Sequence, residues 1–202
     1  MIILGITGGT GCGKTTALDA ITALGGVSLD CDALYHDLLQ TSLPLQQAIR
    51  ARFPAAYPGG VFDRKKLGSI VFADPAALEA LNQITGEHIL RAVRQWLAQQ
   101  EAQRRPLAAI DAIRLLESDL AKLCRWTVAV LAPTEQRVQR LMAREGISEA
   151  YARLRIAAQP SNEDFAARCD AVLMNDCDSA AAFAARCRTF FEHLLKEEST
   201  HG

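Results

Sequence analysis

The sequence predicts an α/β fold, a three-layer α/β/α arrangement around a five-stranded parallel sheet that two helical insertions interrupt. Three observations predict this class. Short β-branched apolar runs alternate with segments whose apolar residues recur at helical spacing. A glycine-rich turn follows the first run directly. A long stretch with only helical periodicity then separates the second run from the third.

Five short apolar runs are the expected strands. The first, 2–6, is apolar on both faces, as in a strand buried inside a parallel sheet. Leu18, Ile21 and Leu24 follow at helical spacing, and two glycines end that helix. The other strands are expected at 27–29, 107–112, 127–132 and 171–174.

The stretch between the second and third expected strands is helical in pattern throughout. Asp63 is placed to cap a helix that carries Leu67, and Asp74 and Pro75 form the start of another. A crossover between parallel strands needs only about a dozen residues. This stretch is several times longer, so we expect it to form a subdomain.

A second insertion follows the fourth expected strand. Thr134 is expected to cap its first helix, Gly146 to end that helix, and Ser148 to cap the next. The final helix of the chain is expected to begin after Asp178 or Ser179. Its buried stripe is expected to consist of Phe183, Cys187, Phe190 and Leu194.

Composition and charge exclude several classes of protein. The 202 residues carry 22 basic and 23 acidic side chains, so no overall field attracts nucleic acid or an anionic membrane. No apolar run approaches the ~20 residues of a membrane span. The start of the chain lacks a secretion signal, and the six cysteines include no C-x-x-C pair. We expect a cytoplasmic protein that binds neither nucleic acid nor membrane.

The glycine-rich turn at 8–15, GGTGCGKT, fits G-x-x-x-x-G-K-[ST] between a strand and a helix. Its glycines let backbone N–H groups turn toward an anion, and the following helix presents its positive end. Lys14 is expected at the β- and γ-phosphates, and the Thr15 hydroxyl on Mg²⁺. The residues expected to bind ATP are Gly9, Thr10, Gly11, Cys12, Gly13, Lys14, Thr15, Thr16 and Asn175.

The rest of the chain narrows the class of nucleotide protein. The motifs D-x-x-G and [NT]-K-x-D of a GTPase do not occur, and 202 residues are few for a motor ATPase. A small phosphotransferase remains, with one insertion to hold an acceptor and the other to close over the phosphates. Arg137, Arg140 and Arg144 of the second insertion are either a solvated helix face or guanidinium groups for the transferring phosphoryl group.

Three carboxylates follow expected strands, at the edge of the sheet where ligands bind. Asp30 and Asp32 come after the second strand, where each either orients and deprotonates an acceptor hydroxyl or caps a helix over 33–39. Chemistry is favoured for Asp32. Asp111 ends the third strand and is expected near Mg²⁺, with a loop anchor as the alternative.

Several motifs resemble those of the dephospho-coenzyme A kinase family, over nearly the whole chain. The resemblance rests on TGGTGCGK at 7–14, Asp30-x-Asp32, DRKKL at 63–67, VFADP at 71–75, RLMAR at 140–144 and RIAAQ at 155–159. It implies a P-loop kinase with a nucleotide-binding core (1–33, 106–133 and 168–202), a helical acceptor domain (34–105) and a lid (134–167).

The resemblance also implies the reaction, which is ATP-dependent phosphorylation of the ribose 3′-hydroxyl of dephospho-coenzyme A. The implied catalytic residues are Asp32, Lys14, Arg140 and Arg144. The implied acceptor-binding residues are Asp32, Asp63, Arg64, Asp111 and Glu117, and Thr15 and Asp111 would hold the metal. A monomer or weak homo-oligomer is expected. A kinase for another small acceptor and a non-catalytic ATP-dependent regulator stay open as alternatives.

Overall fold

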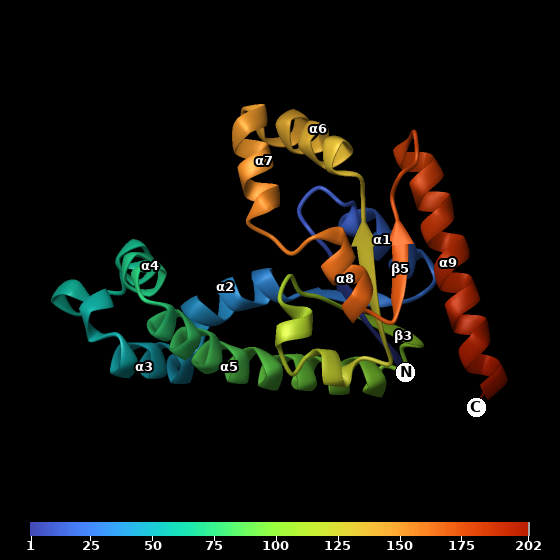
Figure 1. Cartoon of the computed structure of the whole chain (residues 1–202). Helices are drawn as coiled ribbons and strands as arrows, with labels where there is room; N and C mark the ends of the chain where they lie inside the picture. Colours follow the sequence, from blue (N-terminus) through green and yellow to red (C-terminus); the bar gives the residue numbers. More distant parts are fainter. Residues whose placement is uncertain (202) are drawn as a thin grey trace. The chain divides into compact units, whose positions relative to one another are not determined.

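Figure 1 shows the chain in a computed structural model, which describes residues 1–201, with side chains through Lys196. The chain divides into two compact units. Unit 1 comprises Met1–Asp30 and Ala98–Gly202, and unit 2 comprises Cys31–Leu97. The expected lid, 134–167, falls within unit 1 in this division. The assignment of a core, an acceptor domain and a lid stays a prediction.

Unit 1 is built on a five-stranded sheet. The strands are β1 (Ile2–Thr7), β2 (Val27–Asp30), β3 (Leu107–Asp111), β4 (Trp126–Leu131) and β5 (Ala171–Met174). They pair in the order β2-β3-β1-β4-β5, and every pair is parallel. This confirms the expected α/β fold, with strand ends within a residue or so of the predicted ones. The carboxyl end of the central strand β1 leads directly into the glycine-rich turn.

Helices α1 (Lys14–Ala23) and α9 (Ala180–His201) pack on one face of this sheet. Phe183 and Phe191 of α9 are fully buried there, against alternate residues of the strands. Phe190, expected in this stripe, is only partly buried, because Phe191, four residues after Cys187, occupies the buried position instead. Helix α8 (Asn162–Arg168) covers the opposite face, where its Phe165 packs against Leu131.

The chain between β4 and α8 forms two packed helices, α6 (Thr134–Glu145) and α7 (Glu149–Ala157), beyond the carboxyl end of β4 (Figure 1). Gly146 ends α6 in the left-handed conformation and the Ser148 hydroxyl accepts from the Tyr151 N–H, as predicted. The prediction that Thr134 caps α6 is wrong. The helix starts at Thr134 itself, because Pro133 occupies the N-cap and makes no side-chain hydrogen bond there.

Unit 2 is helical. Its helices are α2 (Cys31–Thr41), α3 (Leu43–Arg52), α4 (Arg64–Ala73) and most of α5 (Pro75–Ala102), with short turns η1 (Pro54–Ala56) and η2 (Pro58–Gly60). The Asp63 carboxylate accepts from the Lys66 N–H and caps α4, and Asp74 accepts from the Ala76 N–H at the start of α5. Both starts agree with the sequence. Unit 2 has its own core, to which Leu45, Ile49, Phe53, Leu67 and Val71 belong.

Two short turns, η3 (Leu115–Glu117) and η4 (Ala121–Leu123), connect β3 to β4. Among the described residues, no helix combines the length and the apolar character that crossing a membrane requires.

Candidate active site

The glycine-rich turn forms a loop between β1 and α1, which we call the P-loop (residues 8–13). Its last residue, Gly13, has φ +99° and is the N-cap of α1. A Cβ on Gly13 would stand 2.5 Å from the Asn175 Nδ2, so only glycine fits at this position. The same Nδ2 donates to the Cys12 carbonyl at 2.8 Å. Asn175, just beyond β5, therefore holds the end of the P-loop from outside.

Lys14 and Thr15 follow the P-loop in the first turn of α1. The Lys14 side chain is half-buried, and its Nζ donates to the Gly8 carbonyl at 3.1 Å, back across the loop. Thr15 is exposed. The ammonium group and the N-terminus of the helix place positive charge at one end of the loop, an arrangement that favours phosphate.

Arg137, in the first turn of α6, contacts the middle of the P-loop. Its side chain is only 3% exposed. Its Nε donates to the Thr10 carbonyl at 2.9 Å, and its Nη2 donates to the Gln159 Oε1 at 3.0 Å. The same Gln159 oxygen accepts from the Thr10 N–H at 2.8 Å. Both polar groups of the Thr10 backbone are thus engaged from outside the loop.

Arg140 contacts the next residue of the P-loop. Its Nη1 donates to the Gly11 carbonyl at 3.1 Å, and its Nη2 donates to the Asn175 Oδ1 at 3.2 Å and the Gln136 Oε1 at 2.9 Å. Arg140 therefore combines a loop contact with a partly exposed position. A role of Arg140 on the transferring phosphoryl group stays a prediction.

Arg144 lies in a different setting from the other two arginines. Its side chain is 62% exposed, and its Nη2 pairs with the Glu145 Oε1 at 2.5 Å. Arg155 of α7 pairs with the other Glu145 oxygen. Hydrogen bonds from Arg144 and then Arg155 lower the pKa of the Glu145 carboxyl. The three arginines that share a face in sequence thus have a buried, a half-buried and an exposed environment.

Two of the expected carboxylates lie side by side at the carboxyl edge of the sheet. The register pairs Asp30 of β2 with Asp111 of β3, and Asp111 with Ile6 of β1. The P-loop begins two residues beyond Ile6. Asp30 is exposed and Asp111 is half-buried. The topology therefore places two carboxylates at the carboxyl ends of β2 and β3, next to the start of the P-loop.

Asp32 does not continue the strand. Helix α2 begins at Cys31, so Asp32 lies in its first turn, exposed, and belongs to unit 2. The expectation of a helix over 33–39 placed its start two residues too late, because the chain turns into helix directly after β2. Asp30 and Asp32 are therefore not alternate residues of one extended segment. The role of Asp32 as a base stays a prediction.

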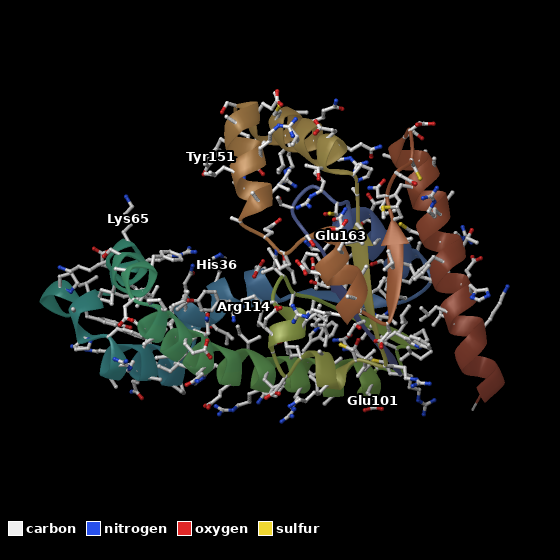
Figure 2. The ribbon with its side chains drawn as sticks, in the orientation of Figure 1. His36, Lys65, Glu101, Arg114, Tyr151 and Glu163 are labelled. Carbon is white, nitrogen blue, oxygen red and sulfur yellow. The ribbon has the colours of Figure 1, made fainter. Side chains whose placement is uncertain are left out.

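The other expected acceptor-binding residues have structural partners of their own. Asp63 caps α4, and Arg64 is the first residue of that helix. The Glu117 carboxylate pairs with Arg168 of α8 at 2.6 Å. Figure 2 labels His36 on α2 and Arg114 in the turn after β3, and both residues are exposed. Acceptor binding by Asp63, Arg64 and Glu117 stays a prediction.

The side-chain oxygens near the loop are suited to binding Mg²⁺ together with a nucleotide. Among the described residues, no group of three His, Cys, Asp or Glu side chains is arranged around a metal position. Mg²⁺ in phosphotransferases needs no such group, because it keeps several waters and binds one or two protein oxygens plus phosphates. The Thr15 hydroxyl and the Asp111 carboxylate are donors of this kind.

Cys12 lies inside the loop and is fully buried. Burial raises the pKa of its thiol, although the charges of Arg137 and Lys14 act in the opposite direction. The thiol is therefore neutral at physiological pH, and Cys12 contributes its backbone and its packing to the site.

Sequence reasoning missed the parts that Arg137 and Gln159 play. Arg137 was grouped with two more exposed arginines, because helical spacing shows a shared face and not what covers it. Gln159 belongs to a recognised motif, but nothing in the sequence points to a contact with Thr10, 149 residues away.

Comparisons with known proteins agree on one family. A family model described as dephospho-CoA kinase matches residues 2–181. A dephospho-CoA kinase of Anaeromyxobacter dehalogenans is 38% identical over 87% of this chain and 84% of that protein. One from Geobacter sulfurreducens is 35% identical over 87% of this chain and 90% of that protein.

Solved structures show the same architecture. TT1252 from Thermus thermophilus superposes with a TM-score of 0.79 at 32% identity, covering 97% of each chain. A dephospho-CoA kinase from Campylobacter jejuni gives 0.65 at 22% identity over 97% of this chain and 98% of that one. A shikimate kinase from Bacteroides thetaiotaomicron gives 0.58 at 12% identity over 96% and 98%, a likeness of fold alone.

Proposed function

The chain belongs to the dephospho-CoA kinase family, and we propose that its residues divide the work of phosphoryl transfer as follows. The activity is that of a dephospho-CoA kinase, which uses ATP to phosphorylate dephospho-coenzyme A at the ribose 3′-hydroxyl and yields coenzyme A and ADP. The observation that carries the proposal is the P-loop between β1 and α1. Lys14 follows the loop directly, and Asp111 ends β3, the strand that pairs with β1.

The donor side consists of the P-loop and the start of α1. Backbone N–H groups of the loop and the N-terminus of α1 bind the phosphates of ATP. The Lys14 Nζ, which donates to the Gly8 carbonyl here, moves onto the β- and γ-phosphates when ATP binds. Lys14 then offsets the negative charge that develops on the leaving phosphate.

Asp32 acts on the acceptor side as the base. Its carboxylate accepts the proton of the ribose hydroxyl, which is too weak an acid to lose that proton unaided. Asp32 is exposed in the first turn of α2, so a substrate has access to it. Asp63, Arg64, Asp111 and Glu117 are the proposed remaining contacts to the acceptor.

Mg²⁺ is the proposed cofactor. The Thr15 hydroxyl and Asp111 would hold it beside the phosphates, where it would neutralise charge on the β- and γ-oxygens. In the lid, Arg140 and Arg144 place guanidinium groups on the transferring phosphoryl group. We further propose that the protein is cytoplasmic, works on the last step of coenzyme A synthesis, and is a monomer or a weak homo-oligomer.

Three variants measured across a Mg²⁺ titration test this division of roles. Asp32→Asn should keep ATP affinity and the fold but lose at least ~10²-fold in kcat, the usual contribution of a positioned base. Asp111→Asn should instead raise the Mg²⁺ concentration needed for half-maximal rate. Asp30→Asn is the matched control, and should cost less than either. If Asp32→Asn stays within a few-fold of wild type, the base is another residue.

A further inference from the structure

Arg137, Gln159 and the Thr10 backbone form a closed ring of hydrogen bonds around the middle of the P-loop. The Thr10 N–H donates to the Gln159 Oε1, Arg137 donates to that same oxygen, and Arg137 also donates to the Thr10 carbonyl. The three donor–acceptor distances lie between 2.8 and 3.0 Å. Nothing in the roles assigned above requires this ring.

The Arg137 side chain is held on all sides by burial and by its hydrogen bonds. Arg137 is 3% exposed, and within the part of the chain that the structure describes it has no carboxylate partner. Among the described residues, its acceptors are the two neutral oxygens of the ring, so losing either would leave a buried cation with one hydrogen bond fewer. A Cβ on Gly9 would lie 2.2 Å from its Nη2, and one on Gly11 3.1 Å from its carbonyl oxygen. The loop glycines therefore close against Arg137.

The contact to the Thr10 carbonyl also sets the direction of the next N–H group. All peptide bonds of the described chain are trans, so the C=O and the N–H of one peptide point in opposite directions. Arg137 on the Thr10 carbonyl thus turns the Gly11 N–H away from the Arg137 guanidinium. Asn175 on the Cys12 carbonyl turns the Gly13 N–H in the same manner.

We propose that Arg137 and Gln159 are positioning residues, which hold the P-loop in its anion-binding shape before ATP arrives. They act through the loop backbone, not by touching the nucleotide. The inference rests on the proposed function, because it assumes that the P-loop binds ATP. In this reading the Thr10 N–H stays with Gln159 when nucleotide binds, and the phosphates are bound by later N–H groups. The competing reading is that Gln159 occupies a phosphate position and leaves when nucleotide arrives.

Two pairs of variants separate the ring from charge and from general packing. Gln159→Met removes the acceptor at nearly constant length, whereas Gln159→Glu keeps an oxygen that can accept both bonds. Arg137→Lys keeps the positive charge but replaces the two donor nitrogens, Nε and Nη2, by a single nitrogen on a different stem. Gln139→Met, at an exposed position of α6, is the matched control. If Arg137→Lys does not fold, Gln159→Met still tests the proposal.

The first readout is the exchange rate of the Thr10 amide hydrogen by NMR, with and without Mg²⁺ and ADP. We expect wild type, Gln159→Glu and Gln139→Met to protect this amide in both conditions. Gln159→Met and Arg137→Lys should raise its exchange at least ~10-fold, the value of one hydrogen bond to a charged network. Faster exchange of the wild-type amide after ADP binds would overturn the proposal in favour of the competing reading.

The second readout is steady-state kinetics with ATP and dephospho-coenzyme A. Gln159→Met should raise the KM for ATP by roughly 10-fold. Its kcat and its KM for dephospho-coenzyme A should change little. An unchanged KM for ATP, or an Arg137→Lys variant with wild-type KM and wild-type exchange, would overturn the proposal. Absence of turnover in the wild type would count against the proposed function instead, since amide exchange and ADP binding need no acceptor.

Discussion

Replacing Gly9 by alanine tests how tightly the P-loop is packed against α6. Gly9 does not have a positive φ, so alanine can adopt its backbone conformation and only the added methyl group matters. That methyl carbon would lie 2.2 Å from the Arg137 Nη2 and 3.0 Å from the Gln159 Oε1. Ordinary contact begins near 3.4 Å, so the guanidinium must withdraw by about 1.2 Å.

A withdrawal of that size breaks the hydrogen bond from the Arg137 Nη2 to the Gln159 Oε1. A hydrogen bond from a charged donor contributes about 1.5–3 kcal/mol, so Gly9→Ala should lower the free energy of unfolding by about that amount. With an m-value typical of small proteins, the urea midpoint should fall by on the order of 1 M. Urea unfolding followed by circular dichroism measures this, and the KM for ATP should rise in parallel. A variant with the wild-type midpoint and the wild-type KM would refute the tight packing of Arg137 on the loop.

Three further predictions follow from other parts of the molecule. Gly86→Ala should raise the free energy of unfolding by roughly 0.5–1 kcal/mol, because Gly86 lies inside α5 and its Cβ would meet no atom within 4 Å; a lower urea midpoint would contradict this. At pH 8, Cys12 should react with iodoacetamide far more slowly in the native protein than in urea, because burial raises the pKa of its thiol and leaves less thiolate. The native rate should increase as the pH rises further. Mass spectrometry of alkylated native and unfolded samples measures both rates. Arg144→Ala should lower kcat more than it raises the KM for ATP and leave the melting temperature unchanged, since the exposed guanidinium pairs, within the described part of the chain, with its neighbour Glu145 alone. An unchanged kcat would make Arg144 part of a solvated surface.

The sheet could be predicted from the sequence because its signals are local. Short apolar runs mark all five strands, and Asp63, Gly146 and Ser148 mark helix ends by side-chain chemistry or backbone freedom. The strand order could not be read in this way, because it depends on pairing between distant segments. Asp32 shows the limit of local reasoning, because α2 begins two residues earlier than expected and Asp32 therefore lies inside the helix instead of before it.

The P-loop could be predicted because its function requires glycines, lysine and threonine at fixed spacing. What surrounds the loop could not. Arg137, Arg140 and Arg144 look equivalent on a helical wheel, yet one is buried, one half-buried and one exposed, and the difference comes from segments far away in sequence. Asn175 was expected at the ATP site, and the structure places its amide on the Cys12 carbonyl.

The identity of the phosphoryl acceptor is the most direct test of the proposed activity. The fold is shared with shikimate kinases, so fold alone does not select dephospho-coenzyme A. Wild-type protein with ATP and Mg²⁺ should be offered dephospho-coenzyme A, AMP, CMP and shikimate separately, with products identified by mass spectrometry and ³¹P NMR. We expect equal amounts of ADP and coenzyme A, with the new phosphate on the ribose 3′-oxygen, and little ADP from the other three acceptors. Phosphorylation of AMP, CMP or shikimate in preference to dephospho-coenzyme A would contradict the proposed activity.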